Sequence, residues 1–143
     1  MRVEAANEVT EELHDAMARL LPQLNATLPV PSIERLEPVL ADPAATLRVA
    51  RERDQIVGTA TVLCFATPFW LKARLDEVVV DASARGRGVG EALVAACIEV
   101  ARQKGAEIVE LQSGRGPQRE AAHRLYRRMG FEPRDSTVFR LKL

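Results

Sequence analysis

The chain has no excess of charge of either sign, no long apolar run and very little cysteine. Its 20 basic residues balance 20 acidic ones, so its charge gives no indication of a general affinity for nucleic acid or for an anionic membrane. The first residues carry no apolar signal segment, and no run approaches the roughly 20 residues that a membrane-spanning helix needs. We therefore expect a cytoplasmic protein that binds neither nucleic acid nor membrane.

The two cysteines, Cys64 and Cys97, both lie among apolar neighbours in the sequence. At such positions buried free thiols are expected rather than a disulfide. Neither cysteine has a suitably spaced histidine nearby, so the sequence predicts no metal site.

Two common phosphate-binding motifs are also absent. A G-x-G-x-x-G fingerprint that starts at Gly86 requires a glycine at position 91, which is Glu91. One that starts at Gly88 requires a glycine at position 93, which is Leu93. The Gly-Lys-Ser/Thr triplet of a P-loop does not occur anywhere. The sequence therefore disfavours these two kinds of nucleotide-binding module.

What the chain does have is a glycine-rich stretch, residues 85–90, between an apolar run at 75–80 and a strongly periodic segment at 89–104. This order predicts a strand, a turn and a helix. Glycines leave the backbone N–H groups of such a turn accessible, and the start of a helix carries a partial positive charge. The stretch therefore predicts a binding site for a phosphate or pyrophosphate.

A length of 143 residues, with 47% hydrophobic and 28% charged residues, indicates one globular domain over residues 1–143. Apolar periodicity predicts helices over residues 8–21, with Pro22 ending the helix, 32–40, with Ser32 as N-cap, 89–104 and 118–129. It predicts strands over residues 1–5, 46–51, 56–65, 75–80, 108–112, 131–133 and 137–141, and a loop or strand end over 66–74. A strand–helix–strand crossover over 75–112 makes two strands parallel, while hairpins elsewhere require antiparallel neighbours. The expected fold is α/β: a mixed, mostly antiparallel central sheet with one parallel pair and helices on both faces.

Three features in a fixed order then give a family resemblance. The loop fits the pattern Arg/Gln-x-x-Gly-x-Gly/Ala at Arg85, Gly88 and Gly90. A strand reading Glu-Val-Val-Val-Asp, residues 77–81, precedes it. A segment reading Arg-Glu-Ala-Ala-His-Arg-Leu-Tyr, residues 119–126, follows it, with Gly-Phe shortly after. In this order, and with this succession of elements, the chain resembles the GNAT superfamily of N-acetyltransferases.

The resemblance implies how an acyl donor, acetyl-CoA, is bound. In this family the strand before the loop splays from its parallel neighbour, and the donor enters the gap. Main-chain groups of Val78, Val79 and Val80 are then expected to pair with the pantetheine arm. The loop amides expected to bind the pyrophosphate are those of Gly86, Arg87, Gly88, Val89, Gly90 and Glu91. Arg85 and Arg87 are expected either to add charge near the phosphates or to face solvent.

The resemblance also implies catalytic roles. Tyr126 is expected to protonate the departing CoA sulfur, the alternative being a tyrosine of the core. Glu77 is the expected general base, and Asp76, Asp81 or a water relay remain alternatives. His123, on the same predicted helix as Tyr126, is expected to lie outward or in local packing.

The sequence thus predicts an N-acetyltransferase that moves acetyl from acetyl-CoA to a primary amine by direct attack in a ternary complex, without a metal. A non-catalytic acyl-CoA-binding regulatory domain is the alternative. The acceptor, a small molecule or a protein amine, is not identified. Ser113 either faces the thioester or only shapes a flexible turn. Dimers are frequent in the family, so a homodimer also remains open.

Overall fold

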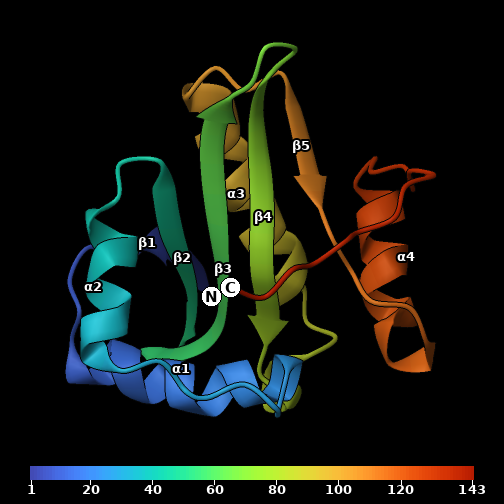
Figure 1. The fold of residues 1–143 in the computed structure, drawn as a ribbon. Helices are drawn as coiled ribbons and strands as arrows, with labels where there is room; N and C mark the ends of the chain where they lie inside the picture. Colours follow the sequence, from blue (N-terminus) through green and yellow to red (C-terminus); the bar gives the residue numbers. More distant parts are fainter. The chain divides into compact units, whose positions relative to one another are not determined.

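The computed structural model describes residues 1–143 as two units, Met1–Gln112 and Ser113–Leu143. The first unit holds a five-stranded sheet and three α-helices, and the second holds one α-helix (Figure 1). None of these helices combines the length and the apolar character that crossing a membrane requires. The whole glycine-rich stretch, residues 85–90, belongs to the first unit.

The strand order in the sheet follows the sequence, β1-β2-β3-β4-β5. Neighbouring strands are antiparallel from β1 to β4, whereas β4 and β5 are parallel. The strands are β1 (Arg2–Ala5), β2 (Ala45–Glu52), β3 (Gln55–Ala66), β4 (Leu71–Val80) and β5 (Ile108–Leu111). The predicted mixed sheet with one parallel pair is therefore confirmed.

Helices cover both faces of this sheet, as predicted. Helices α1 (Glu11–Leu24) and α2 (Ile33–Ala41) lie on one face, and α3 (Val89–Gln103) lies on the other (Figure 1). The Thr10 hydroxyl accepts a hydrogen bond from the Leu13 amide at 3.1 Å, which fixes where α1 begins. The predicted N-cap of α2 is confirmed, because the Ser32 hydroxyl accepts from the Arg35 amide at 3.1 Å.

The face under α1 and α2 is held by a cluster of buried aliphatic side chains. Its members are Leu13, Ala16, Met17 and Leu20 of α1, Leu36 of α2, Leu47 and Val49 of β2, Ile56 of β3 and Val79 of β4. Burying one such side chain fully contributes about 1.5–3 kcal/mol. Because Val79 belongs to this cluster, the core holds β4 in place one residue before its end.

On the other face, a glycine lets α3 approach the sheet closely. A Cβ atom added to Gly58 of β3 would lie 2.9 Å from Leu93 Cδ1 and 3.1 Å from the Val79 carbonyl oxygen. Such distances are shorter than van der Waals contact, so any side chain here would push α3 and the sheet apart. The buried residues of α3 are Val89, Leu93, Val94, Cys97 and Ala101.

Three elements differ most from their predicted bounds. Helix α1 continues past Pro22 to Leu24, because a proline in the last turn removes only one hydrogen bond and Asn25 still donates to the Leu21 carbonyl at 3.0 Å. Strand β4 begins at Leu71 rather than 75, because its first residues pair with β3 from Ala66 onward. The last predicted helix, 118–129, is a short 3-10 helix followed by α4 (Glu120–Arg128).

The hairpin between β3 and β4 has an exposed aromatic tip. The Thr67 amide donates to the Trp70 carbonyl at 2.7 Å, and the Trp70 amide donates to the Thr67 hydroxyl at 3.1 Å. Phe69, between them, is 88% exposed. This tip lies at the end of the sheet opposite the glycine-rich loop (Figure 1).

The two strands predicted at 131–133 and 137–141 are wrong. Neither segment forms a strand, and Phe139 and Leu141 are 92% and 84% exposed. A strand needs the backbone of a neighbouring strand, and these residues pair with none. The prediction of two buried thiols holds for Cys97 but not for Cys64, which is only half-buried.

Candidate active site

The glycine-rich loop joins the end of β4 to the start of α3. The Asp81 carboxylate accepts hydrogen bonds from the Ser83 amide and hydroxyl, both at 3.0 Å, and so stabilises a short 3-10 helix, Ala82–Ala84. Gly86 and Gly88 then adopt φ angles of 77° and 83°, which residues with a Cβ atom rarely adopt. An added Cβ would meet no atom within 4 Å at either position. These glycines are therefore needed for the backbone conformation and not to avoid a clash within the protein.

The backbone N–H groups of residues 86–90 donate to no acceptor of the protein. Helix α3 begins at Val89, and its N-cap, Gly88, has no side chain that could accept from them. The first N–H groups of a helix lack partners within the helix, and the helix dipole adds a partial positive charge there. Five consecutive free donors at a helix start fit an anion such as the pyrophosphate of coenzyme A.

The two arginines of the loop differ in their contacts. Arg85 donates from Nε to the Val80 carbonyl at 3.1 Å, and its terminal nitrogens have no protein partner. Arg87 forms an ion pair with Glu52 of β2 at 2.6 Å, and this hydrogen bond lowers the pKa of Glu52. The charge of Arg87 is thus partly compensated within the protein, whereas the guanidinium end of Arg85 is available to a ligand.

Strand β4 continues beyond its partner β5. The last parallel pair is Leu75 with Leu111, and β4 then runs on to Val80. On its other side, which faces β3, the Asp81 backbone amide donates to the Val57 carbonyl at 2.8 Å. Backbone groups alternate along a strand, so Val79 also turns its N–H and C=O toward β3, while those of Val80 face the open edge. The end of β4 thus presents backbone groups to which an extended ligand can hydrogen-bond.

A β-bulge lies at the start of this open edge. Thr59 pairs with Val79 and Thr61 with Asp76, so two residues of β4, Glu77 and Val78, lie opposite one residue of β3. Glu77 has a φ of 55°, a conformation uncommon outside glycine. Bulges re-aim side chains next to functional sites, and strained backbone often occurs there.

The three candidate bases are in different environments. Asp76 pairs with Arg74 at 3.0 Å. One carboxylate oxygen of Asp81 accepts hydrogen bonds from Ser83, and the other pairs with Arg19 at 3.2 Å. Glu77 is exposed, and its carboxylate has no hydrogen bond or ion pair with the protein. Of the three, only Glu77 has a carboxylate free to accept a proton from a ligand.

Helix α1 contacts the first residues of the loop, which the sequence did not predict. Arg19 pairs with Asp81 and also donates to the Ile56 carbonyl, and the Gln23 side chain accepts from the Ala82 amide at 2.9 Å. Arg19 and Gln23 are four residues apart and therefore share one face of α1. That spacing was the only available signal in the sequence, because their partners are 37 to 62 residues away.

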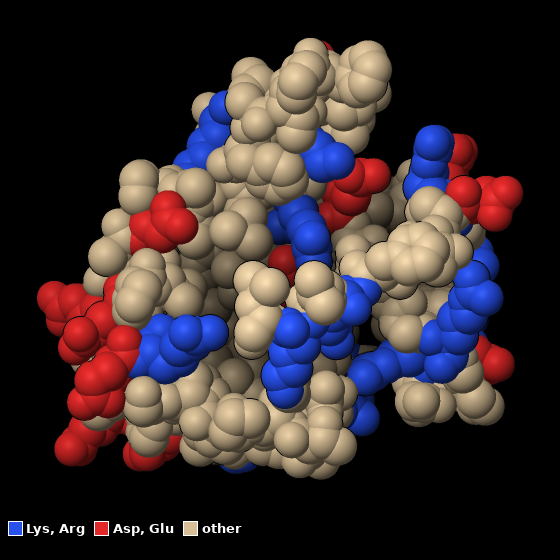
Figure 2. Space-filling model, viewed as in Figure 1, with Lys and Arg blue, Asp and Glu red and all other residues tan.

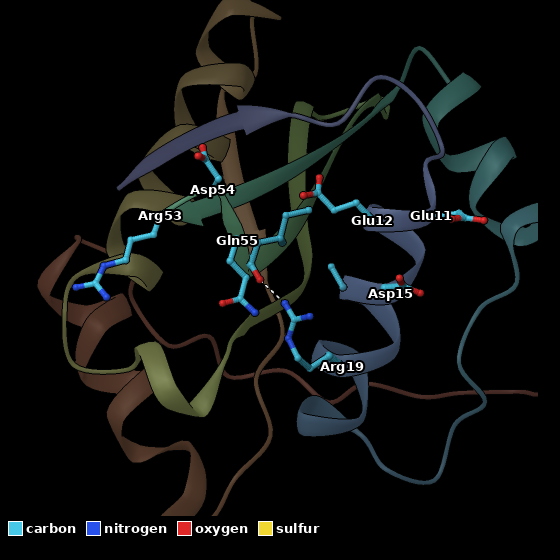
Figure 3. Close-up of a pocket in the computed structure, with 9 residues that line it drawn as sticks. Glu11, Glu12, Asp15, Arg19, Arg53, Asp54 and Gln55 are labelled. Atoms are coloured by element: carbon cyan, nitrogen blue, oxygen red, sulfur yellow. Dashed lines mark hydrogen bonds between the residues drawn. The ribbon is translucent and has the colours of Figure 1, made fainter.

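A pocket of about 450 Å³ lies beside Arg19, between α1 and the turn from β2 to β3. Figure 3 shows Arg19 reaching from α1 to the start of β3, with the carboxylates of Glu11, Glu12 and Asp15 along the same helix. None of the predicted site residues lines this pocket. It is thus separate from the residues that the sequence assigned to donor binding and catalysis.

In the second unit, Tyr126 packs against the Gly-Phe pair of its motif. Gly130 ends α4 with a φ of 97°, and the Phe131 amide donates to the Tyr126 carbonyl at 2.9 Å. The rings of Tyr126 and Phe131 meet edge to face, with centroids 5.9 Å apart. Burial raises the pKa of the Tyr126 hydroxyl, and Arg119 opposes that shift only in part. Tyr126 is therefore in its protonated form at neutral pH.

His123 makes the local contact that was expected, and its partner is Ser113. The two side chains are 3.0 Å apart, His123 Nε2 to Ser113 Oγ, and both residues are half-buried.

Charge is distributed unevenly within each unit. Acidic side chains gather over the part of the first unit that carries α2, whereas basic side chains run along the second unit's helix (Figure 2). The arginines on α4 are Arg124, Arg127 and Arg128. The basic character of the second half of the chain is therefore not confined to the glycine-rich loop.

Two curated relatives resemble parts of the chain. An uncharacterized N-acetyltransferase of Methanocaldococcus jannaschii is 41% identical over 63 residues, which are 44% of this chain and 27% of that protein. The aminoalkylphosphonate N-acetyltransferase of Salmonella typhimurium is 35% identical over 98 residues, which are 65% of this chain and 60% of that protein. The chain thus matches less than two thirds of the length of either relative.

A solved structure covers the chain completely. A putative acetyltransferase from Agrobacterium tumefaciens is 28% identical, with a TM-score of 0.81, and the match covers 100% of both chains. Residues 43–133, well over half of the chain, match the family model of the acetyltransferase (GNAT) domain. This segment includes the open edge of β4, the glycine-rich loop and Tyr126. The chain belongs to the GNAT acetyltransferase family.

Proposed function

We propose that the protein is an N-acetyltransferase that moves the acetyl group of acetyl-CoA to a primary amine by direct attack in a ternary complex. Membership of the family implies acetyl-CoA as the donor. The observation that carries the proposal is that one end of β4 combines an open strand edge with five free loop amides. The pantetheine arm needs main-chain hydrogen-bonding groups along an extended edge, and the pyrophosphate needs free N–H groups close to that edge.

The donor-binding roles divide among the residues according to their backbone direction. Val78 and Val80 offer main-chain groups to the pantetheine arm, and Val79 holds the strand on the core. The pyrophosphate is bound by the amides of Gly86, Arg87, Gly88, Val89, Gly90 and Glu91. Arg85 supplies positive charge through its free guanidinium end. Arg87 adds charge once it releases Glu52 and pairs with a phosphate instead.

Glu77 is the proposed general base. An amine with the pKa of lysine, about 10.4, must lose a proton before it attacks, which costs roughly 4–5 kcal/mol at pH 7. Glu77 is suited to accept that proton because its carboxylate is exposed and unpaired, unlike those of Asp76 and Asp81. Because Glu77 lies on the bulge, its side chain does not follow the regular alternation of side chains along β4.

Tyr126 is the proposed general acid. A thiol resembling cysteine has a pKa of about 8.5, so the CoA sulfur is a tolerable leaving group even without help. The raised pKa of Tyr126 keeps its hydroxyl protonated and able to donate to that sulfur. Tyr126 is therefore expected to accelerate the reaction without being indispensable.

Direct attack is favoured because no cysteine is placed to carry the acetyl group. Cys97 is fully buried in α3, and burial raises the pKa of its thiol to about 12. Cys64 pairs with Ala73, far along β3 from the bulge at Glu77.

The first test of this function is binding followed by turnover. We expect acetyl-CoA to raise the melting temperature, and one or more amines to release free thiol in the presence of acetyl-CoA. The amine panel should include polyamines, amino acids, aminoglycosides, peptides and, given the relative from Salmonella typhimurium, aminoalkylphosphonates.

Two results would contradict the proposal in different ways. If acetyl-CoA does not raise the melting temperature, the proposed donor site is wrong. Stabilisation without thiol release on any amine would favour a non-catalytic acyl-CoA-binding domain.

A further inference from the structure

The aromatic tip of the β3–β4 hairpin and a pocket beside it have no role in acetyl transfer as proposed above. Both belong to the first unit. Phe69 at the tip is almost fully exposed, and a pocket of about 280 Å³ lies next to the tip. We propose that this region is a dimer interface, in which Phe69 of each copy of the chain enters the pocket of the other copy.

The pocket has the size and the apolar walls that an aromatic ring needs. The two strands of the hairpin contribute Phe65, Ala66 and Leu71 to its lining, and the two charged residues that line it are Lys72 and Lys104. A cavity of about 150 Å³ with aliphatic and aromatic walls is large enough to bind benzene. The pocket beside the tip can therefore hold the ring of a phenylalanine.

The two lysines make the pocket suited to an aromatic group in particular. Lys72 Nζ already lies 5.9 Å from the centroid of the Phe65 ring, a distance at which an ammonium group is attracted to an aromatic face. Lys72 also pairs with Glu110 at 2.6 Å, and Lys104 donates to the Pro43 carbonyl at 2.8 Å. These contacts hold both ammonium groups beside the pocket, where they complement the negative face of a second ring.

A second copy of the chain fits this surface because the exposed ring and the pocket lie side by side. Phe69 comes two residues before Leu71, which lines the pocket, yet Phe69 itself does not line it. In a two-fold dimer the same surface of both copies meets, so a surface that carries a projecting ring and a matching cavity is self-complementary. Figure 2 shows that the end of the first unit that carries this hairpin is mostly uncharged, as the centre of an interface is.

The exposed area indicates that this dimer is weak and reversible. Phe65, Phe69 and Trp70 are 41%, 88% and 42% exposed. Since an aromatic side chain has an area of about 150–250 Å², the three expose roughly 350 Å² in each copy. Two such surfaces bury about 700 Å² together, which is less than the roughly 1,200 Å² of stable complexes. We therefore expect a Kd in the micromolar range or weaker.

The first test measures the mass of the full chain by sedimentation velocity across the micromolar range, where we expect a monomer–dimer equilibrium. Phe69→Ser should raise the Kd at least about 30-fold, as the loss of a central interface residue does. Ala66→Trp should raise it similarly although Phe69 is retained, because the indole would occupy the pocket. Phe139→Ser removes an equally exposed phenylalanine of the second unit and should leave the Kd unchanged.

The half-buried thiol of Cys64 gives a direct test of the contact, because Cys64 also lines the pocket. In Pro68→Cys, which keeps Phe69, mild oxidation should join the introduced thiol to Cys64 of a second copy. Within one copy this bond is out of reach. Cys64 lies two residues before Ala66, which pairs with Leu71 below the tip, and position 68 lies still further out. Two strand residues alone span about 6.6 Å, close to the limit of about 7 Å between the Cα atoms of a disulfide.

A non-reducing gel and peptide mapping identify the crosslink, and adding Cys64→Ser to Pro68→Cys should abolish it. A wild-type protein that stays monomeric at every concentration would overturn the inference. A dimer that is equally tight in Phe69→Ser would overturn it too, because another surface would then form the dimer. If the dimer depends on Phe69 but tolerates Ala66→Trp and gives no crosslink to Cys64, the ring lies outside the pocket and the inference is wrong.

Discussion

The two units of the molecule differ in what holds them together. Every fully buried side chain lies in the first unit, and the second unit has none. The second unit relies on local contacts, such as the Phe131 amide on the Tyr126 carbonyl and Ser113 on His123. The comparison teaches that the proposed donor site is built on a packed core, whereas Tyr126 belongs to a segment without a core of its own.

Truncating one leucine to alanine in each unit should show this difference in packing most strongly. Leu93→Ala empties a site that is 0% exposed, and we expect the free energy of unfolding to fall by about 2–5 kcal/mol. Leu125→Ala, in the half-buried stripe of α4, should cost about 1 kcal/mol or less. Urea denaturation of both variants measures the two costs. Equal losses would show that the second unit buries its leucine as deeply as the first.

Tyr126→Phe tests whether the second unit contributes chemistry rather than stability. The variant keeps the ring contact with Phe131 but loses the hydroxyl, so kcat should fall by about one to three orders of magnitude. Acetyl-CoA affinity and the melting temperature should change little. The measurement is steady-state thiol release beside a binding titration, and unchanged kcat would remove Tyr126 from the mechanism.

Two glycines that flank α3 allow a matched test of the glycine-rich loop. Gly88 and Gly105 stand at opposite ends of the helix with φ angles of 83° and 82°, and neither has an atom near a potential Cβ. Alanine at either position should cost about 1–2 kcal/mol of stability, because the left-handed conformation is strained with a Cβ. Only Gly88→Ala should also weaken acetyl-CoA binding, by about tenfold, since it would reorient the amides that we propose to bind the charged phosphates. Equal affinities in the two variants would exclude Gly88 from the phosphate site.

The smallest expected effect concerns Asp81 and pH. The Ser83 amide, followed by the Ser83 hydroxyl and Arg19, lowers the pKa of Asp81 in the folded protein. A lowered carboxyl pKa stabilises the fold above the unfolded value, about 3.9, and this contribution is lost as pH falls through the folded value. Asp81→Asn should therefore lose about 0.5–2 kcal/mol at neutral pH, and the difference from wild type should shrink below about pH 4.

Asp54→Asn is the matched control for this pH dependence. Asp54 pairs with Arg2 at 3.3 Å, but its side chain is 86% exposed, so its loss should be close to zero at every pH. Thermal melts from pH 3 to pH 7 compare the two variants. A pH-independent difference for Asp81→Asn would mean that the carboxylate charge is not what stabilises the loop.

The sequence was sufficient to predict the sheet, its parallel pair and the loop, because these follow from local signals. Alternating apolar residues indicated β2, and a run rich in β-branched residues indicated β3. The glycines at 86 and 88 do adopt the left-handed conformations that glycine favours. The position of the Ser32 cap likewise followed from one residue type before an apolar run.

The rest depended on contacts between distant residues. The apolar run at residues 75–80 could not show that Glu77 and Val78 lie opposite a single residue of β3. The pairing of Arg19 with Asp81 joins residues 62 positions apart, which no local pattern encodes. Residues 137–141 have the composition of a strand, but composition alone does not supply a partner strand.

The aromatic tip of the β3–β4 hairpin gives the molecule a built-in optical reporter. Trp70 is the only tryptophan, and it lies just before the first residue of β4. The glycine-rich loop follows the last residue of β4. At about 3.3 Å per residue, β4 separates the two ends by roughly 30 Å. Quenching of Trp70 emission by acetyl-CoA would therefore signal a change transmitted along the strand, and constant emission would mean that the donor end responds alone.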